Sequence, residues 1–385
     1  MNIILFDTDR ENLYPLTFTR PISDFRVGIV SIKQKWEFYY KSVSVKTVDY
    51  LSEKYPIHLQ KNNVWIDSSI LPSQDLITEI NSLRNGEFLE NNGDVIAVCN
   101  HDMNTVGLDA IESHSTFNKI NDLWDIFSLN GEEIKSDFNH LVKGNSGEEL
   151  SITNTVVGNN PIYLEKGAKV ECSVLNSTDG PIYIGKDAEI MEGSLVRGPF
   201  AMCNNSTLKM GAKIYGPTTL GPYCKVGGEV NNSVFFGYSS KSHDGFLGNS
   251  VIGEWCNLGA DTNNSNLKNN YTEVKLWNYK TERFKKTGLQ FCGLIMADHS
   301  KCGINTMFNT GTVVGVSANV FGSGFPRNII PSFSWGGASG FTTYKTNKVF
   351  EVASVVMGRR NIEFSDTDKS ILEKVFELTS KYRNY

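Results

Sequence analysis

The chain of 385 residues contains no run of eighteen apolar residues, so it offers no candidate for a membrane-spanning helix. Its first seven residues, MNIILFD, hold too short an apolar stretch for a secretion signal. The net charge is −5 and only 21% of the residues are charged, which argues against a general nucleic-acid or anionic-lipid surface. We therefore expect a cytoplasmic protein without nucleic-acid or membrane partners.

Cysteine is scarce and scattered. The seven cysteines form no Cys-x-x-Cys pair and no cluster with histidine at the spacing of zinc ligands, so a structural metal is not expected. An odd number of isolated thiols is typical of a reducing compartment. Proline is also sparse, with 11 residues against 34 glycines, and most of the glycines follow residue 157.

The chain is too long for one hydrophobic core, and its character changes near residue 150. Residues 1–150 alternate between short apolar runs, such as 2–6 and 94–99, and helical patterns, such as 28–40 and the segment after Ser73. This alternation predicts an α/β domain with a mostly parallel, Rossmann-like sheet and ligands at the carboxyl ends of its strands. The polar segment KGNSGEE at 143–149 marks the boundary.

A six-residue rhythm dominates the rest of the chain. Every sixth position from 184 to 226 is aliphatic: Ile184, Ile190, Val196, Met202, Leu208, Ile214, Leu220 and Val226. The rhythm returns at 252–258 and at 296–320, and a small residue usually follows four positions later. A sustained hexad predicts a parallel β-helix over 151–340, whereas a β-sandwich would show period two.

Two interruptions break this register. The step from position 226 to position 252 exceeds four hexads by two, and the step from position 258 to position 296 exceeds six hexads by two. The second gap holds a long loop at 263–290, rich in Asn, Lys and aromatic residues, which we expect to be functional or to be an arm that reaches a neighbouring chain. The tail, 341–385, should end in a helix capped by Ser365 or Asp366.

The hexad array resembles the left-handed β-helix acyltransferases. The segment KSHDGFLGNSVIGEWCNLGADTNNSNL, 241–267, is similar to the acetyltransferase half of the bifunctional N-acetylglucosamine-1-phosphate uridyltransferase / glucosamine-1-phosphate N-acetyltransferase family. The segment LYPLTFTRP, 13–21, is similar to the Leu-x-Pro-Leu-Thr stretch of sugar nucleotidyltransferases. The first domain is short, as in the shorter-headed variant of that family. The resemblance implies acetyl-CoA-dependent N-acetylation of glucosamine 1-phosphate or a similar amino-sugar phosphate, coupled to nucleotidyl transfer that gives UDP-N-acetylglucosamine.

Acyl transfer from a thioester to an amine needs a base, and an imidazole suits this task near neutral pH. His243, at a break in the register, is the first candidate and His299 is its competitor. The resemblance implies that Asn257 and Asn266 bind the sugar phosphate or the amine, although asparagine is also favoured in β-helix turns. It further implies that the backbone of Ala260 lies near the acyl carrier.

The sequence departs from that family in its substrate residues. Phe246 stands where the family has a sugar-binding tyrosine, and the pair Asn231–Asn232 replaces an expected lysine. Three lysines are alternative partners of the sugar phosphate: Lys241, Lys268 and Lys275. Four cations are candidates for the phosphates of coenzyme A: Lys285, Lys286, Arg359 and Arg360.

The first domain needs cations for a triphosphate and acidic oxygens for Mg²⁺ if it transfers nucleotides. Its loop FDTDREN lacks the glycines usual in sugar nucleotidyltransferases. The basic candidates cluster after the first strand: Arg10, Arg20, Arg26 and Lys35. The candidate metal ligands follow or end strands: Asp7, Asp67 and Asp102. The alternative is a degenerate domain whose charges lie on its surface.

Two other functions stay open. The chain could be only a sugar-1-phosphate nucleotidyltransferase, resembling the glucose-1-phosphate thymidylyltransferases, with the β-helix as a scaffold. It could also be a non-enzymatic regulator that binds sugar nucleotides. In each case we expect a homotrimer, because a prism with flat faces leaves edges and an apolar face that three-fold packing buries.

Overall fold

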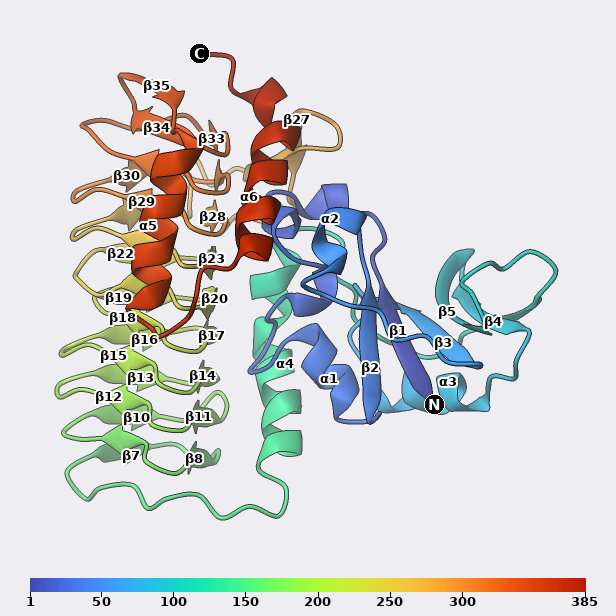
Figure 1. Ribbon diagram of the computed structural model, residues 1–385. Helices are drawn as coiled ribbons and strands as arrows, with labels where there is room; N and C mark the ends of the chain where they lie inside the picture. The colour runs from blue at the N-terminus through green and yellow to red at the C-terminus, as the bar shows by residue number, and fades with distance from the viewer.

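A three-sided β-helix forms the long axis of the protein, and a smaller sheet domain packs against its side (Figure 1). The computed structural model describes all 385 residues. The N-terminal sheet has the order β2-β1-β3-β5-β4-β6. Its strands are β1 (Asn2–Phe6), β2 (Ser42–Lys46), β3 (Asn63–Asp67), β4 (Glu87–Asn91), β5 (Asp94–Asn100) and β6 (Asp109–Glu112). Three of its pairings are parallel, but β5 runs antiparallel to both neighbours, so the sheet is mixed.

The N-terminal helices differ in length from the sequence patterns. Helix α1 (Ile32–Glu37) begins at a capping box on Ser31, later than predicted, because Gly28 takes a left-handed φ of 84° against α4. Helix α3 (Gln74–Ser82) is capped by Ser73, as predicted. Helix α4 (Asp125–Leu141) is the longest of them and lies along the β-helix. The remaining helices are short: α2 (Asp49–Ser52), η1 (Arg10–Leu13), η2 (Leu16–Phe18) and η3 (Ile22–Asp24).

Three parallel sheets form the faces of the β-helix. We call them face A, face B and face C. Face A consists of β7 (Thr155–Val157), β10 (Val174–Asn176), β13 (Leu195–Arg197), β16 (Lys213–Tyr215), β19 (Glu229–Asn231) and β22 (Phe246–Gly248), and β25 (Asn263–Asn264) and β30 (Met307–Phe308) continue it. Face B consists of β8 (Ile162–Leu164), β11 (Ile182–Ile184), β14 (Phe200–Met202), β17 (Thr218–Leu220), β20 (Val234–Gly237), β23 (Val251–Glu254), β28 (Leu294–Met296), β31 (Thr312–Val314) and β33 (Ile329–Ile330). Face C consists of β9 (Lys169–Val170), β12 (Glu189–Ile190), β15 (Thr207–Leu208), β18 (Lys225–Val226), β21 (Ser240–Lys241), β24 (Asn257–Leu258), β29 (Lys301–Cys302), β32 (Asn319–Val320), β34 (Ser334–Gly337) and β35 (Gly340–Thr343).

The hexad residues fill the interior of this prism. Ile184 pairs with Met202 and Ile190 pairs with Leu208, so one coil takes three hexads. All eight positions from 184 to 226 are at most 2% exposed. The predicted fold class, an α/β domain followed by a β-helix and a helical tail, is confirmed.

The first break in the six-residue rhythm, between Val226 and Ile252, does not arise from two inserted residues. Between Val226 and Ile252 the inward positions are Val230, Phe235, Lys241 and Leu247, so the chain takes five inward steps over a stretch shorter than five hexads. Some turns between strands are therefore one or two residues shorter than in a regular hexad. The interpretation of this stretch as four hexads plus two extra residues was wrong. Since the coils continue through this stretch, Lys241 points into the prism and is 1% exposed.

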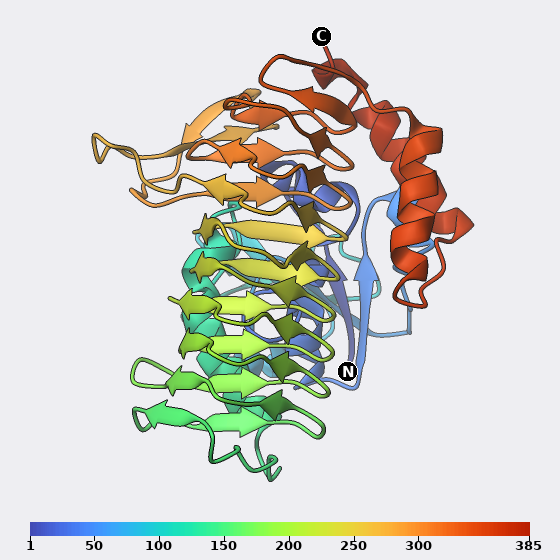
Figure 2. The same cartoon turned by 90° about the vertical axis from the view of Figure 1, so that its left-hand side faces the viewer.

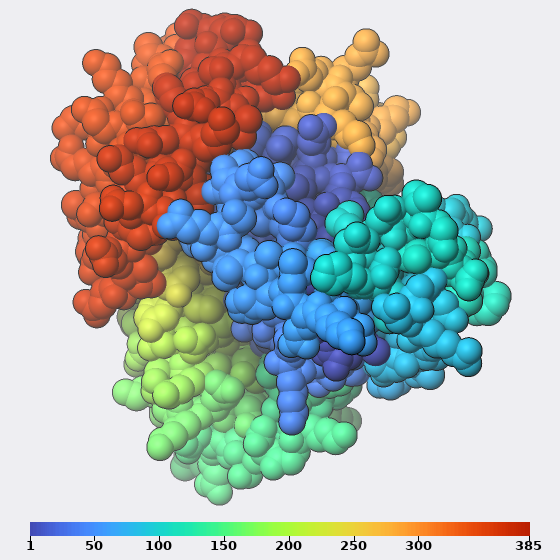
Figure 3. All heavy atoms as spheres, turned by 45° about the vertical axis from the view of Figure 1, so that its right-hand side comes forward, coloured from blue at the N-terminus to red at the C-terminus, as the bar shows by residue number.

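The arm at 263–290 contains an antiparallel hairpin of β26 (Lys275–Asn278) and β27 (Arg283–Lys286). It folds back onto the N-terminal domain of the same chain (Figure 3). Tyr279 packs edge-on against Tyr14 and Phe18, and Lys280 forms a 2.6 Å ion pair with Asp9. Within one chain the arm's apolar side is therefore buried against the first domain, and the prediction that the arm reaches a neighbouring chain stays a prediction.

Two helices close the structure. Helix α5 (Thr346–Gly358) lies in the tail that the sequence predicts to be helical, although no pattern marked its bounds, and it runs along face C (Figure 2). Helix α6 (Asp366–Leu378) starts at a capping box on Ser365, as predicted, and contacts α2. A last 3-10 turn is η4 (Ser380–Tyr382). None of the helices combines the length and the apolar composition that a bilayer-spanning segment requires.

The N-terminal domain and face B share one hydrophobic core. A cluster of 44 buried residues joins Ile3 and Phe25 of the first domain to Phe236 and Ile295 on the outer side of face B. A second cluster of 30 residues fills the prism itself. The first domain is thus fixed to the β-helix by apolar packing over face B, whereas α5 lies along face C and face A carries neither.

Candidate functional site

His243 lies at an exposed corner between face C and face A, where β21 ends and β22 begins. Its imidazole makes no hydrogen bond or ion pair within the chain. The corner is stacked on the corner of the next coil, because the N–H of Asp261 donates to the carbonyl of Asp244 at 3.0 Å. Ala260 is in that second corner, and its own N–H makes no backbone hydrogen bond. An accessible base therefore lies next to an unused backbone donor.

Lys241 fixes this corner from inside the prism. Its Nζ donates to the carbonyl of Gly227 at 3.0 Å and to the carbonyl of His243 at 2.9 Å. Burial lowers its pKa to about 8, although Asp244 and Asp261 act in the opposite direction. The buried ammonium is bonded to these carbonyls and is not exposed to a ligand in one chain, so the structure gives no support to Lys241 as the partner of a sugar phosphate.

The other residues taken from the resemblance surround this corner on different sides. Asn257 is exposed on the outer side of face C, in the coil above Ser240. Asn266 lies at the far end of face A, where its amide donates to Asn249 at 2.9 Å. The ring of Phe246 lies on face A between them, since a Cβ added to Gly248 would be 2.6 Å from both the ring and the Asn266 amide. One chain thus brings Asn257 near the corner but leaves Asn266 about a strand's length, roughly 10 Å, away.

A pocket of about 400 Å³ opens beside Asn257, between face C and the end of α5. Ser242, the residue before His243, is on its rim. Two of the cations named from the sequence, Arg359 and Arg360, line it. The other two do not, because Lys285 forms an ion pair with Asp122 at 2.6 Å and Lys286 is 3.6 Å from Glu273. Lys268 and Lys275 belong to the arm, outside this pocket.

His299 has an environment opposite to that of His243. It occupies a corner between faces B and C, its ring stacks on Trp255 at 6.3 Å, and its Nδ1 is buried without a partner. Burial, and after it the charge of Lys301, lowers its pKa to about 3. An imidazole with so low a pKa is a poor proton acceptor at neutral pH, which favours His243 as the base.

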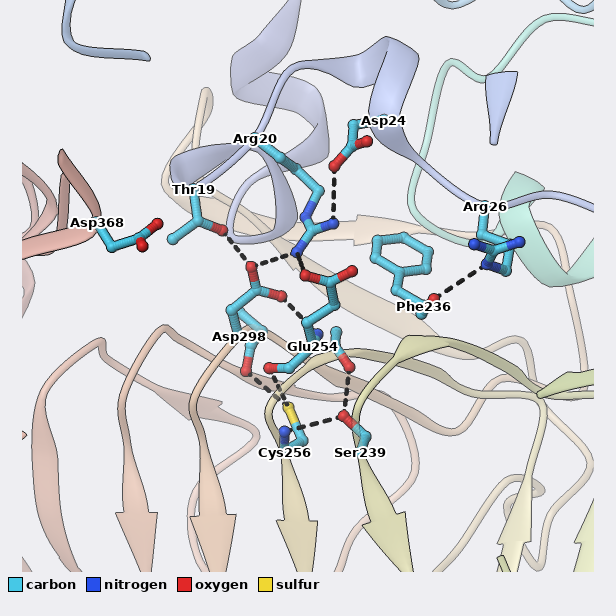
Figure 4. A network of polar contacts seen from close by, with 12 residues as sticks. Thr19, Arg20, Asp24, Arg26, Phe236, Ser239, Glu254, Cys256, Asp298 and Asp368 are labelled. Carbon is cyan, nitrogen blue, oxygen red and sulfur yellow. Dashed lines mark hydrogen bonds and ion pairs between the residues drawn. The ribbon is translucent and has the colours of Figure 1, made fainter. Parts of the chain in front are cut away.

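Arg20 lies at the junction of the first domain and the β-helix. It is 3% exposed, and its guanidinium pairs with Asp298 at 2.6 Å and with Glu254 at 3.1 Å, both on the β-helix (Figure 4). A third pair, with Asp24, is 3.0 Å long. Burial raises the pKa of Asp298, but Arg20 and a hydrogen bond from Thr19 outweigh it and leave that pKa below its usual value. In this structure the charge of Arg20 joins the two parts of the chain, and its predicted role in nucleotide binding stays a prediction.

The remaining basic candidates of the first domain are also engaged. Arg10 is buried and bonds to Asp7 and to the hydroxyl of Thr47. Lys35 is 2% exposed and contacts Asp137 of α4 at 2.6 Å and Glu133 at 2.8 Å. Arg26 donates to the carbonyl of Phe236 on face B at 3.0 Å. The four cations are thus separated, and they form no triphosphate pocket.

The three proposed metal ligands do not meet. Asp7 and Asp67 lie at the carboxyl ends of β1 and β3, but Asp102 follows the antiparallel strand β5 and lies at the opposite edge. Asp7 accepts hydrogen bonds from Ile22 and Ser68, and Asp67 forms a 3.0 Å ion pair with Lys119. No group of three or more His, Cys, Asp or Glu residues could hold a metal ion. We therefore assign no Mg²⁺ ligands.

Sequence reasoning missed several residues that line cavities. At the carboxyl edge of β1 and β3 a small pocket is lined by Thr8, Ser69, Lys119 and Asn121. Beside face C, Lys225 and Lys301 line the pocket under α5. Each lysine comes directly before a buried aliphatic or thiol residue of the hexad array, so it points outward by alternation. The alternation of inward and outward residues in the hexad array could therefore have identified these two lysines as outward-facing from the sequence.

Comparisons with known proteins match the first part of the chain to a family model. A family model described as sugar nucleotidyl transferase matches residues 3–146. No curated protein sequence matches the chain. The match supports the predicted transferase and its nucleotidyl transferase-like first domain.

Solved structures that resemble the chain include three acyltransferases. The polySia-specific acetyltransferase NeuO is 14% identical, with 60% of this chain and 98% of that chain covered and a TM-score of 0.27. LpxA, a UDP-N-acetylglucosamine acyltransferase from Bacteroides fragilis 9343, is 12% identical, with 61% and 84% covered and a TM-score of 0.30. AntD, an N-acyltransferase from Bacillus cereus in complex with dTDP and 3-hydroxybutyryl-CoA, is 12% identical, with 55% and 93% covered and a TM-score of 0.21. Because these TM-scores are low, we assign the β-helix fold from the strand pairing within this chain and not from the similarity to these structures.

Proposed function

We propose that the protein transfers an acetyl group from acetyl-CoA to the amino group of glucosamine 1-phosphate or a similar amino-sugar phosphate, and that the reaction takes place at the His243 corner. The observation that carries the proposal is the exposed, unbonded imidazole in a corner that the buried Lys241 fixes. The unused N–H of Ala260 in the neighbouring corner supports it. The paired cations of the first domain supply no comparable site.

The chemistry follows from these groups. The neutral amine nitrogen attacks the thioester carbonyl carbon, and the imidazole of His243 takes the proton that the nitrogen loses. Negative charge develops on the carbonyl oxygen, where a backbone N–H such as that of Ala260 would stabilise it. The C–S bond then breaks, and the departing thiolate takes the proton from the imidazolium. The products are the N-acetylated sugar phosphate and free coenzyme A.

Three chains in a trimer would complete the site. Face A carries exposed apolar side chains on its outer side, including Val157 and Leu195, and it holds Asn266 and Phe246 on the same side. Packing of face A against a second copy would cover these side chains. It would also bring a neighbour's surface close to the His243 corner, where one chain leaves Asn266 at a distance. The homotrimer is therefore part of this proposal.

The direct test is an acetyl-transfer assay on the full chain. Purified protein is mixed with acetyl-CoA and glucosamine 1-phosphate, free thiol is followed, and the product is identified by mass. We expect thiol release that depends on both substrates. Thiol release that does not need the amino sugar, or none at all, would contradict the proposal.

Nucleotidyl transfer is a second candidate function, and the family match over residues 3–146 favours it. Within that region the carboxyl edge of β1 and β3, with Thr8 and Lys119, is a better position for phosphates than the buried Arg20. The test is pyrophosphate release from UTP and Mg²⁺ with N-acetylglucosamine 1-phosphate. We expect Lys119→Ala to reduce that release. An unchanged rate in Lys119→Ala would remove this edge from consideration.

A further inference from the structure

Four cations surround the pocket under α5, and none of them has an acidic partner, although Lys301 donates to the carbonyl of His299 at 3.0 Å. Lys225 and Lys301 project from face C, and Arg359 and Arg360 project from the end of α5. No ion pair in the chain involves any of the four, and no Asp or Glu lines the pocket. Burial lowers the pKa of Lys225, and the charges of Arg360, Lys209 and Arg359 lower it further. These positive charges repel one another until an anion joins them.

The pocket is built on fixed elements. Lys225, Ser240, Asn257 and Lys301 are successive outward residues of one column on face C, paired from coil to coil. Three steps of about 4.8 Å separate the two lysines, so they lie roughly 14 Å apart. Met357, 5% exposed, anchors the last turn of α5 and sets the place of the two arginines that follow it. A cation near a helix C-terminus is stabilised by the helix dipole, but this does not account for the lysines on the opposite wall.

The side walls limit what can enter. Tyr238 and Trp255 line the pocket toward face B, and their rings are stacked on each other at 4.3 Å, so their edges rather than their faces meet a ligand. A volume of about 400 Å³ accommodates a nucleotide-sized ligand. Because four cations span the pocket, a ligand with two or more phosphates matches it better than one with a single phosphate.

We propose that the pocket between face C and α5 binds the diphosphate of a nucleotide, with Lys225, Arg359 and Arg360 as its main partners. Two ligands share that chemistry: the nucleotide end of coenzyme A and a uridine diphosphate. Ser242 on the rim is bonded directly to His243, so a long ligand held here would reach the reacting corner. The identification of the ligand as coenzyme A rests on the proposed acetyl transfer. The diphosphate site itself rests on the charges and the cavity alone.

Binding is measured by calorimetry on the full chain with pyrophosphate, coenzyme A and UDP as separate probes. We expect pyrophosphate to bind, because it carries the shared chemistry. Tighter binding of coenzyme A than of UDP assigns the pocket to the acyl donor, and the reverse order assigns it to a sugar nucleotide. Absence of binding by all three probes would overturn the site.

Two variants test the opposite walls of the pocket. Lys225→Gln removes a charge from face C, and the double variant R359Q/R360Q removes two from α5. We expect each lost charge-assisted contact to weaken binding of the preferred probe by roughly tenfold or more. The matched control is Lys169→Gln, because Lys169 is exposed in the outward position of face C, on β9, and does not line the pocket. If either pocket variant binds as tightly as the control, the inference is wrong.

Acetyl transfer separates this inference from the proposed function. The pocket variants should raise the KM for acetyl-CoA and leave kcat within a few-fold of the wild type, because they do not contact the reacting atoms. If the wild type shows no acetyl transfer while the variants still lose UDP affinity, the proposed function fails and the site stands. If acetyl transfer is present and the variants keep normal KM and affinity, the function stands and the site fails.

Discussion

The protein uses its cations in two opposite ways. In the first domain, Arg10, Arg20 and Lys35 are buried and each is paired with carboxylates 2.5 to 3.1 Å away. Around the pocket under α5, Arg359 and Arg360 are paired with none. Paired and buried charges satisfy one another and hold the chain together. Unpaired charges at a cavity await a partner from outside, so the second region is the better guide to function.

The largest effect should come from breaking a buried pair. Arg20→Ala leaves Asp298 and Glu254 without their cation, and removing one partner of a buried ion pair costs about 3–5 kcal/mol. We expect the free energy of unfolding to fall by about that amount in urea titration. Arg359→Ala, an exposed cation without a partner, is the control and should change it by less than about 0.5 kcal/mol. If Arg20→Ala and Arg359→Ala lose the same amount of unfolding free energy, the cations of the two regions do not differ in their contribution to stability.

The exposed His243 and the buried His299 differ in the same way, and this difference concerns the base of the proposed reaction. We expect His243→Ala to reduce acetyl transfer at least about a hundredfold, the usual contribution of a positioned general base, and to leave the fold intact. His299→Ala should keep most of the activity, because its low pKa prevents it from accepting the proton. Rates of thiol release at neutral pH check both. A crippled His299→Ala beside a mild His243→Ala would reverse the assignment.

Lys241 combines both uses, since it is buried but donates only to carbonyls. Its pKa is about 8 in the folded chain against an ordinary 10.5, so between these values the unfolded chain binds the extra proton. Stability should therefore rise with pH from about 8 to 10.5, by on the order of 3 kcal/mol. Lys241→Met should lack that rise in urea titrations at the two ends of this range. A rise of equal size in Lys241→Met would assign it to other groups.

The same variant tests the lysine's effect on the corner. Loss of the bond to the carbonyl of His243 should loosen that residue, and we expect acetyl transfer to drop by about tenfold with little change in the KM for acetyl-CoA. An unchanged kcat would show that the corner holds its shape without Lys241.

The smallest effect concerns assembly. Face A carries exposed apolar side chains on its outer side, at Val157 and Leu195, whereas face B is already covered by the first domain. A charged residue at Leu195, as in Leu195→Lys, should therefore weaken a trimer without unfolding the chain. Light scattering at micromolar concentration should give three times the chain mass for the wild type and a smaller mass for the variant. A wild-type monomer would contradict the homotrimer.

The sequence was informative where the structure is periodic. Positions such as Ile184 and Met202 are inside the prism because a coil repeats every three hexads, and a local pattern is enough to find them. It failed at Lys241, since shortened corners moved the hexad count and placed a lysine at an inward position. It also missed the ion pair of Arg20, whose partner Asp298 lies 278 residues away in the chain. Pairings at that distance leave no local signal.

The same limit applies to the candidate site. His243 could be found from its place at a register break and from the resemblance around it. The pocket under α5 could not, because it needs Lys225 and Arg360 to meet across two elements, and one of these, α5, had no recognised pattern. Alternation along face C indicated which lysines point outward, but not what lies over them.

The central claim is that paired cations hold the structure and unpaired ones bind a ligand. The most direct test measures two matched variants, Arg20→Gln and Arg360→Gln, for both unfolding free energy and coenzyme A affinity. We expect Arg20→Gln to lose stability and, under conditions where it is folded, to keep its affinity for coenzyme A. It predicts that Arg360→Gln keeps its stability and binds coenzyme A roughly tenfold more weakly. If Arg360→Gln is destabilised like Arg20→Gln while its affinity is unchanged, the two groups of cations do not differ in function and the account is wrong.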